Sequence, residues 1–405
     1  MSNILVTWEL GENWGHLSRD LPVARRLRAA GHRVAFAVAD TRIAADILDP
    51  EGFAFVQAPF VRRPTAPSKM LAGHAEIVLA RGYDDPYVLR GLVGGWLGTF
   101  DLFRPDVLLA DYAPTAVLAA RIRAMPAVLA GNGFELPPRV FPLPSCRPWD
   151  AVPPGRLAAS EATALRHANQ VLATAGSAPL DQLADLFTGR RRILTTFAEL
   201  DHFGERTDEE YAGSVFELPR AQRVAWQSEG VGKRIFAYLR PSTPRVEDLL
   251  IALRANGADT ICAFPGAPTA LVQQYRSARL RIVATAVEIE PLLSAADLVI
   301  GHGSGTVAAA LLAGVPLLLL PRWAEQRLGA MRVEALGAGL VALGQAAPPS
   351  YPALIERLLS EPTYRQAALR FAEKYVGFRS EHAVARVAEA VQRIDSQAAA
   401  HVVSP

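Results

Sequence analysis

Residues 297–339 read DLVIGHGSGTVAAALLAGVPLLLLPRWAEQRLGAMRVEALGAG, and this stretch decides the fold. Its first apolar run is short and unbroken, which is typical of a strand that is buried on both faces of a parallel sheet. A glycine-rich turn at residues 301–306 follows, and then an alanine-rich stretch of helical character and a second apolar run. The order strand, turn, helix, strand predicts a βαβ unit.

The turn at residues 301–306 has the composition of an anion-binding loop. Its glycines allow a close approach of the backbone to a ligand, and the N–H groups and dipole of the following helix favour negative charge. Ser304 and Thr306 add hydroxyl groups, and His302 adds a ring N–H. We interpret the turn as a seat for phosphate or diphosphate. The alternative is a purely local turn in which Ser304 caps the helix.

Two series of alternating strands and helices run along the chain. The first begins with the apolar run at residues 4–8 and the second with the run at 234–239, and polar, unpatterned sequence separates them. The fold class is therefore α/β with two domains. We expect a first domain at residues 1–218, an interdomain linker at 219–232, a second domain at 233–395 and a tail at 396–405.

Composition narrows the class of protein further. The chain has 405 residues and a formal net charge of +2, which gives no indication of nucleic-acid binding. Cys146 and Cys262 are the only cysteines, too few for a disulfide framework, so a reducing compartment is favoured. The longest uncharged stretch is broken by glycines, a histidine and a proline, and the N-terminus lacks the pattern of a signal peptide. We expect a cytoplasmic protein without nucleic-acid partner or integral membrane association, and of unknown oligomeric state.

Four linked elements of the quoted stretch resemble the donor-binding signature of GT-B glycosyltransferases, especially the UDP-glycosyltransferase-like family 1 with its macrolide and other natural-product members. The matching elements are an H-x-G-x-G-T-like loop at 302–306, an A-A-G-V-P-like strand entry at 312–316, P-x-x-x-[DE]-Q at 321–326 and R-V-x-x-L-G-A-G at 332–339. The resemblance implies two Rossmann-like domains that face each other across a cleft, with C-terminal helices packing back.

The resemblance also implies a nucleotide-sugar donor, a UDP- or dTDP-sugar, as co-substrate of the second domain, without a metal or another cofactor. Arg240 follows the first strand of the second series, where it would neutralise phosphate. The residues implied in donor binding are Arg240, His302, Gly303, Ser304, Gly305 and Thr306 for the diphosphate, and Glu325 and Gln326 for the sugar hydroxyls. The alternative for Glu325 and Gln326 is a solvated helix start with a favourably placed acid.

One position departs from the family pattern. The family often has a glutamate in the helix after the loop, where it holds the ribose hydroxyls. The matching position here falls on Ala309 or Ala310, and neither side chain can accept a hydrogen bond. The sequence therefore leaves open how ribose is held and whether the base is uracil or thymine.

The first domain carries a second part of the resemblance. The turn at residues 11–16 resembles the family's G-x-x-G-H region, with Pro22 six residues after His16. By resemblance, His16 is the general base and Asp111, at a strand end, orients its ring; imidazole has a suitable pKa for this role. The alternatives are local ones, in which His16 is a polar cap and Asp111 caps the next helix.

The acceptor site is the least determined part. Two segments, 60–98 and the proline-rich 134–156, are expected to be long irregular loops, and such loops on an α/β scaffold often meet ligands. The alternative for their aromatic residues is a small hydrophobic core beneath the loops. The candidate acceptor-binding residues are Asn13, Trp14, Tyr83, Trp96, Asn132 and Phe134.

These observations predict an inverting, metal-independent glycosyltransferase that moves a sugar to a hydroxyl of a small, largely apolar acceptor. A nucleotide-sugar hydrolase or epimerase on the same fold is one alternative, although the carboxylates or histidines that it needs cannot be placed in the sequence. A non-catalytic helper protein for a partner transferase is another. The missing ribose carboxylate favours the helper protein, whereas His16 and Glu325 favour the enzyme.

Overall fold

The computed structural model describes residues 1–12, 14–62, 70–216, 221–226, 232–343 and 350–402. The chain divides into two compact units. Met1–Glu217 and Arg379–Pro405 form the first unit, and Leu218–Phe378 form the second. This division differs from the expected one because residues 379–395 group with the first unit. The expected linker at 219–232 lies largely outside the described residues.

The first unit is built on a parallel sheet of six strands in the order β3-β2-β1-β4-β5-β6. β1 and β4 are neighbours, and Trp8 pairs with Asp111 in their register. β4 and β5 are buried along their whole length, which agrees with their continuous apolar sequences. The strands are β1 Asn3–Trp8, β2 Arg33–Val38, β3 Ala54–Gln57, β4 Val107–Asp111, β5 Ala127–Gly131 and β6 Arg191–Leu194.

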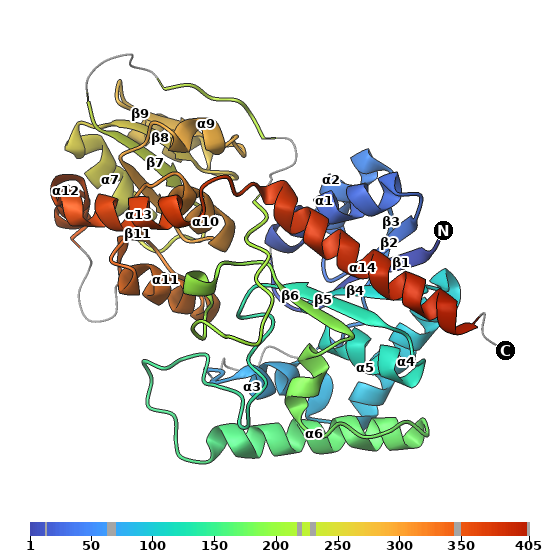
Figure 1. The fold of residues 1–405 in the computed structure, drawn as a ribbon. Helices are drawn as coiled ribbons and strands as arrows, with labels where there is room; N and C mark the ends of the chain where they lie inside the picture. Colours follow the sequence, from blue (N-terminus) through green and yellow to red (C-terminus); the bar gives the residue numbers. More distant parts are fainter. Residues whose placement is uncertain (13, 63–69, 217–220, 227–231, 344–349, 403–405) are drawn as a thin grey trace. The chain divides into compact units, whose positions relative to one another are not determined.

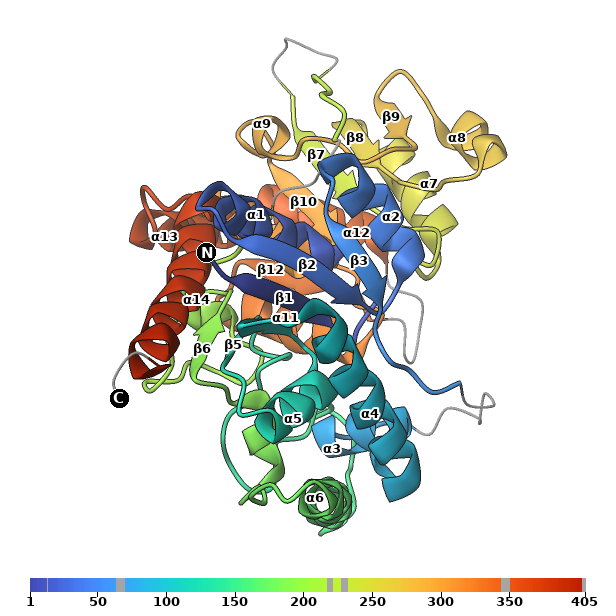
Figure 2. The same ribbon diagram turned by 90° about the vertical axis from the view of Figure 1, so that its right-hand side faces the viewer.

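Helices cover both faces of this sheet. α1 and α2 lie on one face and α4 and α5 on the other, as right-handed crossovers running in opposite directions require (Figure 2). The C-terminal helix α14 returns to the first unit and packs along α1 (Figure 1). The helices are α1 Gly15–Ala29, α2 Thr41–Leu48, α3 His74–Val78, α4 Pro86–Phe103, α5 Pro114–Ile122, α6 Arg156–Thr174 and α14 Ser380–Val402.

Two expectations for the first unit are wrong. The segment 60–98 is not an irregular loop, because α3, a π-helical turn at Leu79–Tyr83 and most of α4 lie within it. The expected tail is helical as far as Val402. The proline-rich segment 134–156, in contrast, has no strand or helix before α6 begins at Arg156.

The second unit repeats the same topology. Its parallel sheet has the order β12-β11-β10-β7-β8-β9, so the first strand of the series, β7, again lies beside the fourth, β10. Its core comprises apolar side chains of these strands together with α7 and α12. The strands are β7 Arg234–Tyr238, β8 Asp259–Ala263, β9 Leu280–Val283, β10 Leu298–Gly301, β11 Leu317–Leu319 and β12 Gly339–Val341.

The helices of the second unit follow the predicted alternation, with one addition. The addition is α8, whose Tyr275 lies in the core with Leu271 and Val272 packed against it. The helices are α7 Val246–Asn256, α8 Thr269–Tyr275, α9 Glu290–Leu293, α10 Ser304–Leu312, α11 Ala324–Ala335, α12 Tyr351–Ser360 and α13 Pro362–Lys374.

Each sheet reverses its strand order at one point, between β1 and β4 in the first unit and between β7 and β10 in the second. At such a point the loops from neighbouring strands leave in opposite directions, and a crevice forms at the carboxyl ends of the strands. Ligands of open α/β sheets bind there. In the described part of the chain, no helix has the length and apolar character that crossing a membrane requires.

Candidate functional site

His16 and Asp111 meet at the reversal point of the first sheet. His16 lies in the first turn of α1, directly after the loop that leaves β1, and Asp111 is the last residue of β4. The Nδ1 atom of His16 donates a hydrogen bond of 2.8 Å to Oδ2 of Asp111. The two residues are 8% and 0% exposed. The sequence prediction that these two side chains pair is thus matched by their geometry.

The local alternatives for these residues do not match the structure. Neither α1 nor α5 has a hydrogen bond from the side chain of its own N-cap residue. Instead, Glu9 reaches the start of α5, where its Oε2 accepts hydrogen bonds from the backbone N–H groups of Thr115 (2.9 Å) and Ala116 (3.3 Å). Burial raises the pKa of Glu9 to about 7, although these hydrogen bonds act to lower it. Asp111 therefore does not cap α5, and its carboxylate contacts His16 instead.

The ring of His16 is confined by two residues. Trp8 stacks on it, with ring centroids 5.1 Å apart and an interplanar angle of 18°. Beside Nε2, Gly11 comes so close that a Cβ atom there would collide with this nitrogen. Gly11 also has φ +88°, a conformation that favours glycine. With Nδ1–H donated to Asp111, Nε2 carries the lone pair, and only the absence of a side chain at residue 11 leaves space beside it.

Sequence analysis missed Arg19 and Glu135, which complete this cluster. Arg19 donates a hydrogen bond to Oδ1 of Asp111, and its Nη1 lies 2.8 Å from Oε2 of Glu135. Oε1 of Glu135 lies 3.6 Å from Nδ1 of His16. Arg19 follows His16 by three residues, a spacing that places both on one helix face, so a signal existed. No spacing in the sequence connects Glu135 with His16.

The charges of the cluster change its protonation. Burial alone would lower the pKa of His16, but the carboxylates of Asp111 and Glu135 outweigh burial, and the pKa is raised above 6.5. Burial would raise the pKa of Asp111, but Arg19 and His16 hold it below its ordinary value. Burial and the neighbouring Asp111 raise the pKa of Asp20 well above its ordinary value. Asp20 therefore keeps its proton, and Asp111 is the ionised partner.

His16, Asp111 and Glu135 also offer donor atoms within 4.8 Å of one another, as a metal site would. The guanidinium of Arg19, however, is paired with both carboxylates. A cation bound between them would face this positive charge at close range. The cluster therefore has the chemistry of a buried ion-pair network around a histidine.

The candidate acceptor residues have different positions. Tyr83, Trp96 and Phe134 are 1%, 0% and 8% exposed, and Trp96 packs against Phe100. Their burial fits the alternative of a hydrophobic core beneath the surface segments. The side chain of Asn132 accepts hydrogen bonds from the backbone N–H groups of Phe134 and Glu135, so it shapes the turn that presents Glu135. Trp14 is partly exposed, and Asn13 lies outside the described residues.

The reversal point of the second sheet carries His302 and the start of α10. His302 follows β10, and α10 begins at Ser304 with Gly303 as its N-cap residue. No side chain caps this helix, so the interpretation of Ser304 as the cap is wrong. Ser304 is exposed, and Gly305 and Thr306 are partly exposed in the first turn. The first N–H groups of the helix thus lack a capping side chain and remain suited to an anion.

Positive charge surrounds His302. Burial lowers its pKa to about 4, and the charges of Arg322 and Arg240 contribute in the same direction, while Glu325 opposes them. His302 is 8% exposed, and its Nδ1 has no hydrogen-bond partner among the described residues. A neutral ring with an unpaired nitrogen and two nearby guanidinium groups fits an anionic ligand. Arg322 was not a sequence candidate, and no motif marked it.

Glu325 and Gln326 lie in the first turn of α11. The side chain of Gln326 accepts a hydrogen bond of 3.0 Å from the backbone N–H of Arg322, so it has a local role at this turn. Ala309 and Ala310 are buried within α10, as expected for side chains that cannot bind ribose. No described residue of the helix replaces the family's glutamate, because α10 contains no acidic residue.

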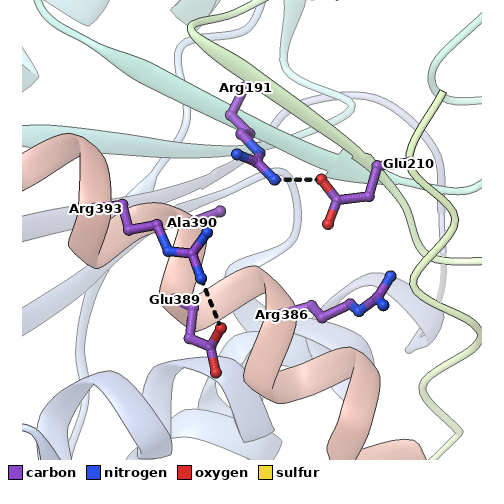
Figure 3. A pocket seen from close by; sticks show the side chains of 6 residues that line it. All are labelled: Arg191, Glu210, Arg386, Glu389, Ala390 and Arg393. Carbon is purple, nitrogen blue, oxygen red and sulfur yellow. Dashed lines mark hydrogen bonds and ion pairs between the residues drawn. The ribbon is translucent and has the colours of Figure 1, made fainter. Parts of the chain in front are cut away.

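A separate surface pocket of about 290 Å³ lies in the first unit between β6 and α14 (Figure 3). Arg191 pairs with Glu210 at 2.6 Å, and Arg393 pairs with Glu389 at 3.4 Å. The first pair joins β6 to the segment that follows it and the second lies within α14, while Arg386 of α14 donates a hydrogen bond of 3.2 Å to the backbone carbonyl of Tyr211. The pocket shares no residue with the cluster around His16.

Comparisons with known proteins agree with this architecture. Residues 250–392 match the family described as erythromycin biosynthesis protein CIII-like, C-terminal domain. None of the curated proteins matches the chain by sequence.

Among solved structures, the glycosyltransferase VinC in complex with DTDP is 18% identical with a TM-score of 0.66, over 95% of this chain and 99% of that one. The spinosyn rhamnosyltransferase SpnG complexed with thymidine diphosphate is 19% identical with a TM-score of 0.66, over 96% and 100%. SsfS6, a glycosyltransferase of Streptomyces sp. SF2575, is 19% identical with a TM-score of 0.65, over 98% and 100%.

Two parallel sheets of the same strand order, each in its own unit, define an α/β protein of the doubly wound class. Since the structural matches extend over nearly the whole chain, this protein has the two-domain GT-B fold of the natural-product glycosyltransferases. Within its second half, residues 250–392 are similar to the C-terminal domain of the erythromycin CIII-like family.

Proposed function

We propose that this chain is an inverting, metal-independent glycosyltransferase. It would move a sugar from a UDP- or dTDP-sugar to a hydroxyl group of a small, largely apolar acceptor, such as a natural product. The first unit would bind the acceptor and the second the donor. The nucleotides in the VinC and SpnG structures are thymidine diphosphates, which supports a dTDP-sugar as the first donor to test.

The observation that carries this proposal is the hydrogen bond between His16 and Asp111 at the reversal point of the first sheet. Asp111 holds the ring in the tautomer whose Nε2 can accept a proton. Nε2 would take the proton of the acceptor hydroxyl while the hydroxyl oxygen forms a bond to the anomeric carbon. The bond from that carbon to the diphosphate oxygen breaks at the same time. Attack opposite the leaving group inverts the anomeric configuration.

The second unit would receive the negative charge of the departing diphosphate. The open N-terminus of α10, with Ser304 and Thr306, would donate hydrogen bonds to the phosphate oxygens. His302, with its unpaired Nδ1, would add a further hydrogen bond, and Arg240 and Arg322 would add positive charge. By the resemblance to GT-B glycosyltransferases, Glu325 and Gln326 would contact the sugar. These groups supply the stabilisation for which other transferases use a divalent cation.

Two other functions on this fold remain candidates for specific reasons. The alanines at 309 and 310 lack the ribose-binding carboxylate, which favours a helper protein for a partner transferase. A hydrolase or epimerase would use the same donor site without an acceptor. Release of free or epimerised sugar from the donor alone would support that class, whereas a transferase releases little sugar until an acceptor is added.

The first experiment is a thermal-shift panel of UDP, dTDP, GDP, ADP and CMP, with and without EDTA, on wild type and His302→Ala. A ligand at 100 times its Kd stabilises a protein by about 2.7 kcal/mol. We expect UDP or dTDP to raise the Tm equally with and without EDTA, and the rise to shrink in His302→Ala. If no nucleotide raises the Tm, the donor site is wrong and the helper protein becomes the better proposal.

A further inference from the structure

Negative charges outnumber positive charges in the cluster around His16. Asp111 and Glu135 are carboxylates within reach of the ring, at 2.8 Å and 3.6 Å from Nδ1. Among the residues that the structure describes, Arg19 is the cation that pairs with both of them. The side chains of all three are at least nine-tenths buried, so water screens their charges weakly. Two negative charges therefore face one positive charge.

The third acid, Asp20, does not change this count. Asp20 is 2% exposed and forms a side-chain hydrogen bond with Asp111. Two buried carboxyl groups in contact share a proton, because both cannot be ionised at close range. Asp111 is paired with Arg19 and His16, so the proton lies on Asp20, which donates to Asp111. Asp111 thus accepts from His16, Arg19 and Asp20, and these three donors fix the orientation of its carboxylate.

We propose that Arg19 and Glu135 balance the charge around His16, so that the cluster has one uncompensated negative charge at rest and becomes neutral when His16 takes up a proton. Arg19 is then a positioning residue that acts through Asp111, and Glu135 supplies the charge that the imidazolium will compensate. This inference rests on the proposed function of His16 as the base.

The balance explains why both residues are needed. Without Arg19, two carboxylates would face His16 unopposed, and the ring would be protonated at neutral pH and unable to accept a proton. Without Glu135, the remaining pair of Asp111 and Arg19 would be neutral, and protonation of the ring would leave a buried positive charge. The charged groups that act on His16 are Asp111 from β4, Glu135 from the segment after β5 and Arg19 from α1, and Asp20 of α1 contacts Asp111.

The test measures the protonation of His16 directly. In protein labelled with ¹³C-histidine, the ring signal that disappears in His16→Gln belongs to His16. Its titration midpoint is then followed by NMR in wild type, Glu135→Gln and Arg19→Met. A charge within 4–6 Å displaces a midpoint by about one pH unit or more. We expect Glu135→Gln to lower the midpoint and Arg19→Met to raise it, each by about that amount.

Glu12→Gln is the matched control, because Glu12 is an exposed acid of the loop before α1. It should leave the midpoint at the wild-type value. Arg19→Lys keeps the positive charge and should restore most of the wild-type midpoint, which separates charge from packing and also serves if Arg19→Met does not fold. Displacements of Glu135→Gln and Arg19→Met in the same direction, or none in either, would overturn the inference.

The NMR midpoints need no substrate, so this test is independent of the proposed function. If the function also holds, the acidic limb of kcat/KM will move with the midpoints in both variants. Opposite midpoint displacements in a protein without transfer activity would retain the charge balance and reject the glycosyltransferase.

Discussion

Each unit places a histidine at the reversal point of its sheet, after the first strand of the series in one unit and after the fourth in the other, and the two histidines have opposite surroundings. His16 follows β1 and His302 follows β10, each beside the point where its sheet reverses strand order. Carboxylates surround His16 and raise its pKa above the ordinary value against the effect of burial. Burial and two guanidinium groups lower the pKa of His302 to about 4.

This difference shows that the topology determines where a site forms and the neighbouring charges determine what it can do. A histidine among carboxylates can accept a proton and stabilise the resulting imidazolium. A histidine among arginines stays neutral and can only join them in binding an anion. The proposed division into an acceptor-activating unit and a donor-binding unit follows from this contrast.

The largest effect should come from replacing each of the two histidines in turn and comparing the two variants. His16→Gln removes a general base and should reduce turnover by about 10²–10⁴-fold while dTDP or UDP binds as in wild type. His302→Gln should instead weaken nucleotide binding. Turnover and nucleotide Kd would be measured on both variants, with His32→Gln, a turn residue of the first unit, as control. Unchanged turnover in His16→Gln would refute the assignment of the base.

A smaller effect is expected from closing the space beside Nε2. Gly11→Ala places a Cβ atom against His16 and should lower kcat/KM by about 100-fold through displacement of the ring. Gly31→Ala is the control, because Gly31 has a similar φ of +91° but nothing within 4 Å of the added atom. Both variants should lose stability, measured by chemical denaturation, with the larger loss in Gly11→Ala because of the collision, but only Gly11→Ala should lose activity. Equal activities would mean that the ring is not confined by residue 11.

The cationic side of the comparison predicts a loss of donor affinity. Arg322→Gln removes one of the two positive charges near His302 and should raise the Kd for the nucleotide diphosphate about 10-fold, since a hydrogen bond to a charged group contributes about 1.5 kcal/mol or more. Arg276→Gln, an exposed arginine of the same unit, should leave the Kd unchanged. Isothermal titration calorimetry with dTDP and with thymidine separates a phosphate contact from a contact to the nucleoside. An equal loss for both ligands would contradict the phosphate contact.

The smallest effect concerns stability against pH. His302 has a folded-state pKa of about 4 and an unfolded value of 6.5, so the unfolded chain binds more protons between these values. Its contribution is therefore complete above pH 6.5 and is lost as the pH falls toward 4, by up to about 3 kcal/mol. His302→Gln should flatten the decrease in the free energy of unfolding over this window. A slope identical to that of wild type would show that His302 is protonated without cost in the folded state.

Much of the fold could be predicted because periodicity and turn residues carry it. The buried strands β1, β4, β7 and β10 are continuous apolar runs, and their order gives two Rossmann-like series without any structural information. The prediction for the segment 60–98 was wrong because α4 contains glycines, aromatic residues and a proline, which suggest a loop. Its helical form depends on packing beneath the surface, as the burial of Trp96 shows.

The sites divide in the same way. His16, Asp111 and the loop at 302–306 could be found because a family resemblance marks them. Glu135 could not, because it reaches His16 only through the turn that Asn132 shapes after β5. Arg322 could not, because only the folded second unit brings its charge to His302. Spacing reports neighbours on one helix or strand, and contacts between distant segments need the fold itself.

The return of α14 to the first unit has a consequence for folding during synthesis. α14 packs on α1, and Gln392 lies 3.5 Å from His32, 360 residues earlier in the chain. A ribosome completes the whole second unit before it releases the helix that covers α1. During translation the first unit must therefore wait with one helical face uncovered, while the second unit can fold from a continuous segment.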